Sequence, residues 1–328
     1  MFLHFRCCIV YTMEIDLLSS IFMHLRLKAS IQNVFDAGGR WAIEVPIHHG
    51  IKIHSILKGR CWISLADDPV PRELAEGDCY LLPRGNAFLM ASDPAGSAVE
   101  LAPAMLLRKS EGITQLNGGG DFLGQGLFFD FESPFADILF QSLPSLIVVS
   151  GATSQASELQ VNIRRFASEF RSMRMGRSLI LNQLAPVILV DLLRTYFTET
   201  PGNPSWFGAA SESELSRVLS LMHTDYARRW TLDELASEIG MSRSKLAVRF
   251  KIAVGIAPME YLCRWRMEIA RDLLRDEGKS LSEVSHLVGY DSESAFSSAF
   301  LRVLKCRPGS FQKKPQGRGL DIHLTYGA

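Results

Sequence analysis

Two stretches in the second half of the chain show the same order of polar and apolar positions, offset by 49 to 50 residues. The first covers residues 231–258 and the second covers residues 280–308. Each opens on Thr or Ser with Glu three residues later, which is the capping box that begins a helix. Mostly apolar residues then recur at i, i+3, i+4 and i+7, and this spacing predicts one buried face of a short helix.

Both stretches then continue into a second helix. Gly240 and Gly289 follow the first helices, where the chain must reverse, and Ser242 and Ser292 stand where a second N-cap belongs. Each second helix carries a pair of apolar anchors at i and i+4, and a proline closes each stretch: Leu246 with Phe250, Phe296 with Phe300, Pro258 and Pro308. Such a pair of helices is the helix-turn-helix motif, whose second helix enters the major groove of DNA. One copy fits a plain helical packing unit equally well, whereas two aligned copies favour DNA binding.

The segment between the two copies predicts one long helix. Leu262, Ile269, Ala270 and Leu273 form an apolar stripe from Pro258 to about Glu277, and proline suits the first turn of a helix. Roughly 20 helical residues span about 30 Å, close to the roughly 34 Å repeat of DNA. We therefore expect a rigid rod that places both recognition helices in successive major grooves.

Residues 211–315 resemble the DNA-binding domain of the AraC/XylS family of bacterial transcription regulators. The resemblance rests on five segments in this order: WTLDELASEIGMSRSKLAVRF, GIAPMEYL, RMEIARDLL, VGYDSESAFSSAF and RPGSF. It implies a cytoplasmic regulator of transcription and no enzyme activity. We expect an activator, and the sequence leaves activation and repression both open. The implied partners are double-stranded DNA, a second copy of the chain in a homodimer, a small-molecule effector and RNA polymerase.

The same resemblance implies which residues face DNA. It places base reading on the first recognition helix at Ser244, Ala247 and Val248, the last of which is often arginine in the family. The other DNA-facing candidates on that helix, mainly for phosphates, are Arg243, Lys245, Arg249 and Lys251. The candidates on the second recognition helix are Glu293, Ser294, Ser297 and Ser298. This second set is poorer in positive charge, so we expect it to contribute less affinity. Lys305 also stands where the family usually has a helix-ending glycine.

The pattern of the first half of the chain predicts short strands separated by turns. RCWISL (60–65) and CYLLP (79–83) are apolar runs between Gly and Pro residues, which predicts a small barrel or sandwich. GDCYLLPRGNAF resembles the second cupin motif, with Gly77, Pro83 and Gly85 in register but Phe88 in place of the final His. The first cupin motif retains only His54. A metal site needs three or four converging ligands, so we expect no metal, no cofactor and no catalytic residue.

A cupin-like domain of this kind predicts an effector pocket at the mouth of the barrel. The candidates are aromatic and polar residues on the expected strands: Trp41, His54, Trp62, Tyr80, Arg84 and Phe88. Ordinary core packing is the alternative for each of them. Two other functions stay open: a cupin-type enzyme fused to a helical module, and a dimeric DNA-binding protein whose barrel is purely structural.

These patterns together predict an α+β multidomain protein. A cupin-like β-barrel sensor domain (13–150) precedes a helical connector (151–198) and a Pro- and Gly-rich linker (199–210). Gly176 is expected to separate two helices of the connector, which either form a dimer contact or cover the barrel. The all-α domain with two helix-turn-helix motifs and their joining helix follows at 211–315.

Charge and cysteine content agree with this organisation. The chain is neutral, with 35 basic and 35 acidic residues, yet residues 240–320 hold 15 basic against 8 acidic ones. A basic module on a slightly acidic body is typical of a DNA-binding protein. The six cysteines include no Cys-x-x-Cys pair, which argues against zinc and disulfide frameworks and fits a reducing cytoplasm. MFLHFRCCIVYT is apolar but too short to span a bilayer, and the recognisable pattern begins at Met13, so we expect no membrane contact.

Overall fold

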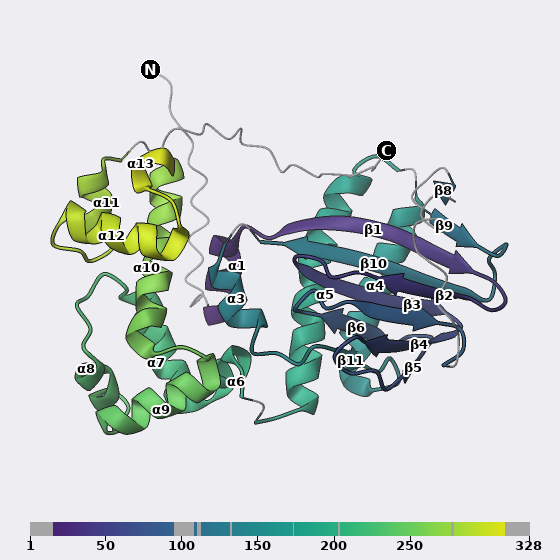
Figure 1. Ribbon diagram of the computed structural model, residues 1–328, viewed down its shortest axis with the longest axis horizontal. Helices are drawn as coiled ribbons and strands as arrows, with labels where there is room; N and C mark the ends of the chain where they lie inside the picture. The colour runs from purple at the N-terminus through teal and green to yellow at the C-terminus, as the bar shows by residue number, and fades with distance from the viewer. Residues whose placement is uncertain are drawn as a thin grey trace, which may run out of the picture.

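The computed structural model describes residues 16–94, 108–109, 113–131, 133–172, 174–202, 204–276 and 279–311. A β-rich half occupies the right of Figure 1, and a helical half that ends in yellow lies to its left. This architecture confirms the predicted fold class, an α+β chain with a β-sheet domain followed by an all-α domain.

The β-rich half contains two sheets. Seven strands form the larger sheet in the order β11-β6-β3-β10-β1-β9-β8. Their bounds are Ile147–Val149, Cys79–Leu82, Ile51–Lys58, Phe122–Asp130, Lys28–Ala37, Ile113–Leu116 and Arg108–Lys109. The smaller sheet has the order β2-β7-β4-β5, with bounds Ala42–Val45, Phe88–Ala91, Arg60–Leu65 and Arg72–Ala75. All paired strands are antiparallel except β1 and β9. The two strands that the sequence predicted from RCWISL and CYLLP are β4 and β6.

Alternation along the strands divides the interior into two cores. On β6, Tyr80 and Leu82 pack with the core between the sheets, whereas Cys79 and Leu81 join the core on the opposite face. The inner core also takes Ile56 from β3. Successive side chains of a strand point to opposite faces, so both faces of the large sheet are covered.

Helices cover the outer face of the large sheet. They are α3 (Phe135–Phe140), α4 (Ser157–Arg171) and α5 (Arg177–Glu199), with a 3-10 turn at Ser154–Ala156. The expected break between the two long helices is confirmed, because Gly176 has a φ of 82° directly before α5. By length and composition α5 is apolar enough to cross a membrane, but half of that stretch is buried. A core helix passes the same test, so the finding is weak evidence for a membrane span.

The segment between the two halves is only partly a linker. We expected residues 199–210 to be a linker, yet most of α6 (Trp206–Ser211) falls in this range, with Ser205 as its N-cap. The Trp206 side chain is fully buried and Phe207 is nearly so. Tertiary packing on both halves orders this helix, because two large aromatic side chains leave water there.

The helical half begins with α7 (Ser213–Thr224). The helix pair α8 (Leu232–Ser237) and α9 (Arg243–Val254) follows, then the long α10 (Pro258–Asp276). A second pair, α11 (Leu281–Leu287) and α12 (Glu293–Leu304), precedes the short α13 (Pro308–Phe311). In Figure 1, α10 runs from one helix pair to the other. The N-terminal α1 (Leu17–Leu25) contacts both α7 and α10, and so joins the halves.

Candidate nucleic-acid interface

The first helix pair is built as its sequence predicts. The Thr231 hydroxyl accepts from the Glu234 backbone N–H, and the Glu234 carboxylate accepts from the Thr231 backbone N–H at 2.7 Å. These bonds satisfy N–H groups that a helix start leaves unpaired. The Ser242 hydroxyl accepts from the Lys245 backbone N–H and so caps α9. Leu246 and Phe250 are fully buried, which fixes the inner face of α9.

The second helix pair repeats this construction. Ser280 and Glu283 form the second capping box, and Ser292 caps α12. Phe296 and Phe300 are fully buried at the positions of the first pair's anchors. Gly289 has a φ of 82°, and a Cβ there would lie 2.2 Å from the Ala227 carbonyl oxygen. Only glycine fits this turn, because both the φ angle and the close backbone contact exclude a side chain.

The outer face of α9 presents polar and apolar side chains to solvent. Arg243, Ser244, Lys245 and Lys251 are exposed, whereas Ala247 is half-buried. Val248 is 59% exposed. Ile252, one turn further along, is 66% exposed and was not among the expected residues. The i, i+4 spacing from Val248 is the signal that places it on the same face. An exposed aliphatic pair of this kind suits contact with thymine methyl groups.

Arg249 differs from the other candidates on α9. Its guanidinium forms ion pairs with Glu212 and Glu214, at 2.6 Å for Glu214. Both acids lie at the start of α7, so this side chain is directed toward the protein. In this structure Arg249 holds α9 against α7.

The outer face of α12 carries no exposed cation among the four expected positions. Glu293, Ser294 and Ser298 are exposed and Ser297 is half-buried. The Ser298 hydroxyl donates to the Ser294 carbonyl at 2.9 Å, within its own helix. Lys305 ends α12 with a φ of 57°, the left-handed conformation that Gly255 adopts after α9.

Helix α10 fixes the two pairs relative to each other. Its 19 residues correspond to a rod of about 28 Å. The Arg266 guanidinium donates to the Tyr226 and Arg228 carbonyls at 2.7 Å each, and it lies 5.7 Å from the Tyr290 ring. Tyr226 precedes the first helix pair and Tyr290 belongs to the second, so Arg266 ties both to the rod.

The residues expected to line an effector pocket in the barrel do not all lie together. His54 stacks on Tyr80 with ring centroids 5.0 Å apart, and Phe88 lies 6.1 Å from His54. Trp41 is buried in the same core but packs on Phe122 at 4.9 Å. These four therefore belong to the packed interior.

Trp62 and Arg84 lie elsewhere. Trp62 is half-buried, and its strand neighbours Cys61 and Ile63 point into the barrel core, so Trp62 points to the other face of its sheet. The Arg84 side chain donates to the Leu143 carbonyl, outside the barrel core. Side chains alternate between the two faces along β4, and this alternation was enough to predict that Trp62 faces away from the barrel core.

Two basic residues near His54, Lys52 and His48, were not among the expected effector residues. Lys52 precedes His54 by two positions on β3, is only 8% exposed, and lies 5.7 Å from the Phe88 ring. Burial lowers the pKa of Lys52 to about 8. Burial, with the charge of Lys52 nearby, also lowers the pKa of His48 to about 4 and that of His54 to about 3. Within the described part of the chain, neither the His48 nor the His54 Nε2 atom has a hydrogen-bond partner.

The described residues bear on two kinds of chemistry, metal binding and thiol reactivity. No group of three or more His, Cys, Asp or Glu side chains among them is placed to hold a metal ion. Burial raises the pKa of the Cys61 and Cys79 thiols to about 12. A thiol must ionise to react readily, so these two cysteines are poor oxidant sensors.

Comparisons with known proteins agree with this construction. A family model described as a cupin matches residues 16–198, and one described as a helix-turn-helix domain matches residues 235–314. The chain is 35% identical over 305 residues to an AraC-like transcription regulator of Streptomyces antibioticus, covering 92% of this chain and 99% of that protein. It is 28% identical over 305 residues to the transcriptional regulator AlkR of Acinetobacter baylyi, covering 91% and 99%. A more distant likeness is to ToxT of Vibrio cholerae, with 12% identity, a TM-score of 0.35, and coverage of 87% and 96%.

Two helix-turn-helix units on one rod, preceded by a cupin-like domain, define a DNA-binding regulator of transcription. The chain belongs to the AraC-like family of transcription regulators. This membership confirms the resemblance seen in the sequence.

Proposed function

We propose that the protein binds two successive major grooves on one face of DNA through α9 and α12. The observation that carries this proposal is the rod α10, to which Arg266 ties both helix pairs. On α9 we assign phosphate contacts to Arg243, Lys245 and Lys251, and base contacts to Ser244, Ala247 and Val248. On α12 the corresponding positions are Glu293, Ser294, Ser297 and Ser298. The second helix adds less affinity, because it presents fewer positive charges to the DNA backbone.

Footprinting on the DNA that flanks the protein's own gene tests this proposal. Two protected major grooves about one helical turn apart support the arrangement. Arg243→Ala should weaken binding more than Ser298→Ala at equal salt concentration. Equal protection by the two variants contradicts the ranking of the helices, and binding that is only non-specific and salt-sensitive contradicts the proposal as a whole.

We also propose that a small anionic effector binds near Lys52, His48 and His54 in the cupin-like domain. Three basic side chains cluster there, and within the described residues no ion pair of Lys52 is present. An anion would keep Lys52 charged and would supply acceptors for this cluster. A panel of small carboxylates should raise the melting temperature of the full chain, and Lys52→Met should remove that response. A chain that no carboxylate stabilises would favour a purely structural barrel.

A homodimer through α4 and α5 completes the proposal. Val161 on α4, Leu179 on α5 and Met175 between them are 64%, 60% and 98% exposed. Exposed apolar residues on two helices that pack together are candidates for such a contact. Val161→Lys together with Leu179→Lys should convert a dimer to a monomer in sedimentation experiments, whereas Val70→Lys, at an exposed valine elsewhere, should not. RNA polymerase remains a proposed partner in the cytoplasm.

A further inference from the structure

The charged residues at the start of α12 are acidic, although the proposed function places this helix in a groove of DNA. Asp291 directly precedes the N-cap Ser292, and Glu293 is the first residue of the helix; both acids are exposed. Further along α12, the Arg302 guanidinium bonds the Glu260 carboxylate at 2.8 Å. The N-terminal residues of a recognition helix contact base edges, so the DNA phosphates beside this end would meet two negative charges.

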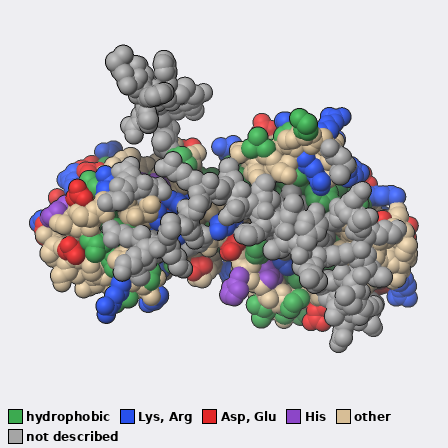
Figure 2. All heavy atoms as spheres, turned by 90° about the horizontal axis from the view of Figure 1, so that it is seen from above, with side chains coloured by type: hydrophobic (Ala, Val, Ile, Leu, Met, Phe, Trp, Pro, Cys, Tyr) green, Lys and Arg blue, Asp and Glu red, His purple; other side chains and the backbone are tan. Residues whose placement is uncertain are grey.

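A cation from the other helix pair reaches this end of α12. Arg229 lies two residues before Thr231, the N-cap of α8, and its guanidinium forms an ion pair with the Asp291 carboxylate. The two side chains are 73% and 68% exposed, so the pair is open to solvent. Figure 2 shows basic and acidic side chains interspersed over the helical half, at its left. Arg229 therefore brings a positive charge to a helix start whose own charged residues are acidic.

The backbone that carries Arg229 is fixed on both sides. The Arg266 guanidinium donates to the carbonyls of Tyr226 and Arg228 at 2.7 Å each. Trp230 is 4% exposed, and its indole N–H donates to a backbone carbonyl at 3.0 Å. These contacts hold the main chain in place before and after Arg229, while its side chain extends into solvent.

The same segment packs against the turn that leads into α12. Gly289, in that turn, lies so close to the Ala227 carbonyl that a Cβ on the glycine would overlap it. Ala227 is two residues before Arg229, so this contact fixes the base of the arginine relative to α12. The side chain can still exchange one oxygen partner for another, because the N–H groups of a guanidinium bind carboxylate and phosphate oxygens in the same paired geometry.

We propose that Arg229 binds a DNA phosphate beside the groove that α12 enters, and that Asp291 holds its guanidinium at this position in the absence of DNA. This inference rests on the proposed binding of two grooves and adds a contact from outside the two recognition helices. The neighbouring Arg228 does not share this role, since its guanidinium lies 3.8 Å from the Trp230 ring and pairs with Glu234 of the first helix pair at 3.6 Å.

Salt titrations of binding to the DNA fragment protected in the footprint test this inference. Arg229→Gln should lower the salt slope by about 1, because one phosphate contact is lost. The affinity advantage of the unaltered chain over this variant should then shrink roughly three- to fourfold between about 50 and 200 mM salt. Arg40→Gln is the matched control and should leave the slope unchanged, since Arg40 is an exposed arginine that pairs with Asp93 in the β-rich half at 3.0 Å.

A double change separates a phosphate contact from simple neutralisation of Asp291. Asp291→Asn removes the carboxylate that the guanidinium would neutralise. If Arg229 binds a phosphate, adding Arg229→Gln to Asp291→Asn should again lower the salt slope by about 1. If Arg229 only neutralises Asp291, the added change leaves the slope as it is, and that result overturns the inference.

Duplexes that carry one uncharged methylphosphonate linkage locate the contact. A linkage beside the groove of α12 should abolish the difference between the unaltered chain and Arg229→Gln, and linkages beside the groove of α9 should not. A difference that persists at every linkage, or that disappears only beside the groove of α9, overturns the assignment. The footprint of the unaltered chain is measured first. Without two protected grooves the proposed function fails, whereas two protected grooves with an unchanged slope for Arg229→Gln overturn this inference alone.

Discussion

The Ser133 hydroxyl donates a hydrogen bond of 2.6 Å to the Glu268 carboxylate, and this bond joins the sensor half to the middle of α10. Glu268 is 1% exposed and forms an ion pair with Arg271, one turn along the same helix. Arg271 in turn donates to the carbonyl of His24 on α1 at 3.1 Å. The rod that carries both recognition helices is therefore held by the sensor half at its centre. Effector binding that shifts α1 or the segment before α3 would act directly on the rod.

Ser133→Ala should destabilise the protein by about 2 kcal/mol, because a buried carboxylate loses a charge-assisted hydrogen bond. Urea unfolding of the full chain measures this loss. Ser145→Ala is the matched control, since its hydroxyl bonds Asp67 at 3.2 Å in an exposed position, and it should cost less than about 0.5 kcal/mol. Equal losses in the two variants would show that the contact between Ser133 and Glu268 contributes nothing special to the junction.

Stability should fall as the pH drops from 7 to 5, because the buried His54 and His223 and the half-buried His48 stay neutral in the folded protein. Burial lowers the pKa of His54 and of His223 to about 3 each. Below about pH 6.5 the unfolded chain takes up protons that the folded chain does not, so stability present at higher pH is progressively lost. The loss at pH 5 is about 2 kcal/mol for each of His54 and His223 and smaller for the half-buried His48.

Urea unfolding at pH 7 and pH 5 measures this effect. His54→Gln should reduce the difference between the two pH values by roughly a third to a half, since it removes one deeply buried group and leaves His223 and the half-buried His48. His49→Gln changes an exposed histidine and should leave the difference intact. If His54→Gln shows the same pH dependence as the unaltered chain, the buried ring is not the source.

The features that the sequence predicted best are local ones. The capping boxes at Thr231 and Ser280 and the turn at Gly289 depend on residues within a few positions of each other, so their spacing reveals them. Arg249 shows the limit of this reasoning, because its partners Glu212 and Glu214 lie more than 30 residues earlier. Helical spacing places Arg249 near the outer face, and only the tertiary contact with α7 shows that it turns inward.

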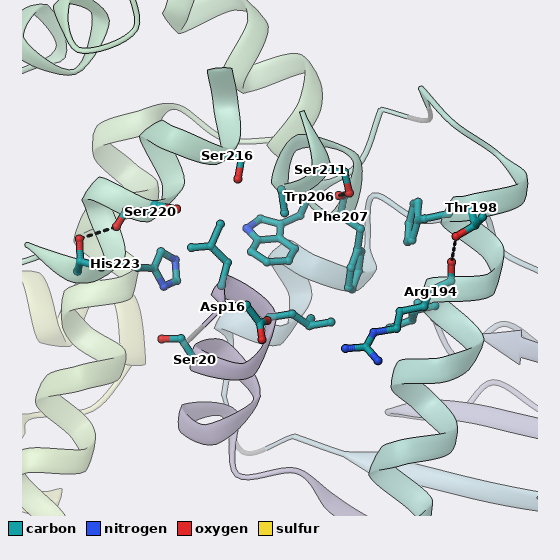
Figure 3. A pocket seen from close by; sticks show the side chains of 16 residues that line it. Asp16, Ser20, Arg194, Thr198, Trp206, Phe207, Ser211, Ser216, Ser220 and His223 are labelled. Atoms are coloured by element: carbon teal, nitrogen blue, oxygen red, sulfur yellow. Dashed lines mark hydrogen bonds between the residues drawn. The ribbon is translucent and has the colours of Figure 1, made fainter. Parts of the chain in front are cut away.

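The packing of α6 between the halves (Figure 3) could not be predicted for the same reason. The Pro- and Gly-rich composition of 199–210 indicates a linker, and nothing local indicates that Trp206 becomes fully buried. Its burial follows from contacts with elements far away in sequence, among them Tyr261 on α10. The barrel shows the opposite case, since β4 alternates clearly enough to place Trp62 outside its core.

Lys305→Gly should stabilise the protein by about 1 kcal/mol. Lys305 ends α12 with a φ of 57°. This left-handed conformation costs a residue with a Cβ about 1–2 kcal/mol relative to glycine. Glycine recovers only part of that difference, because it loses more backbone entropy on folding. Gly255 is the matched position after α9, with a φ of 87°, so Gly255→Ala should destabilise by a similar amount. Thermal unfolding of both variants measures the pair. A lower melting temperature for Lys305→Gly would mean that the lysine side chain contributes more than its backbone strain costs.

Lys245→Ala should change DNA binding but not stability, whereas Arg249→Ala should change stability but not the salt dependence of DNA binding. Lys245 is exposed on the outer face of α9, so its loss should leave stability nearly unchanged and reduce the salt slope of DNA binding by about 1. Arg249 pairs with two glutamates of α7. Its loss leaves those like charges close together, which should lower the melting temperature while the salt slope stays unchanged.

Binding to a fixed duplex over a series of salt concentrations, together with thermal unfolding, separates the two roles. A reduced salt slope for Arg249→Ala would show that its ion pairs open on DNA and that it contacts a phosphate after all. The double change Glu212→Gln with Glu214→Gln then identifies the cause. If the ion pairs compete with DNA, this variant frees Arg249 and raises affinity. If they only position α9, it loosens the recognition helix and lowers affinity, which is the result that the geometry predicts.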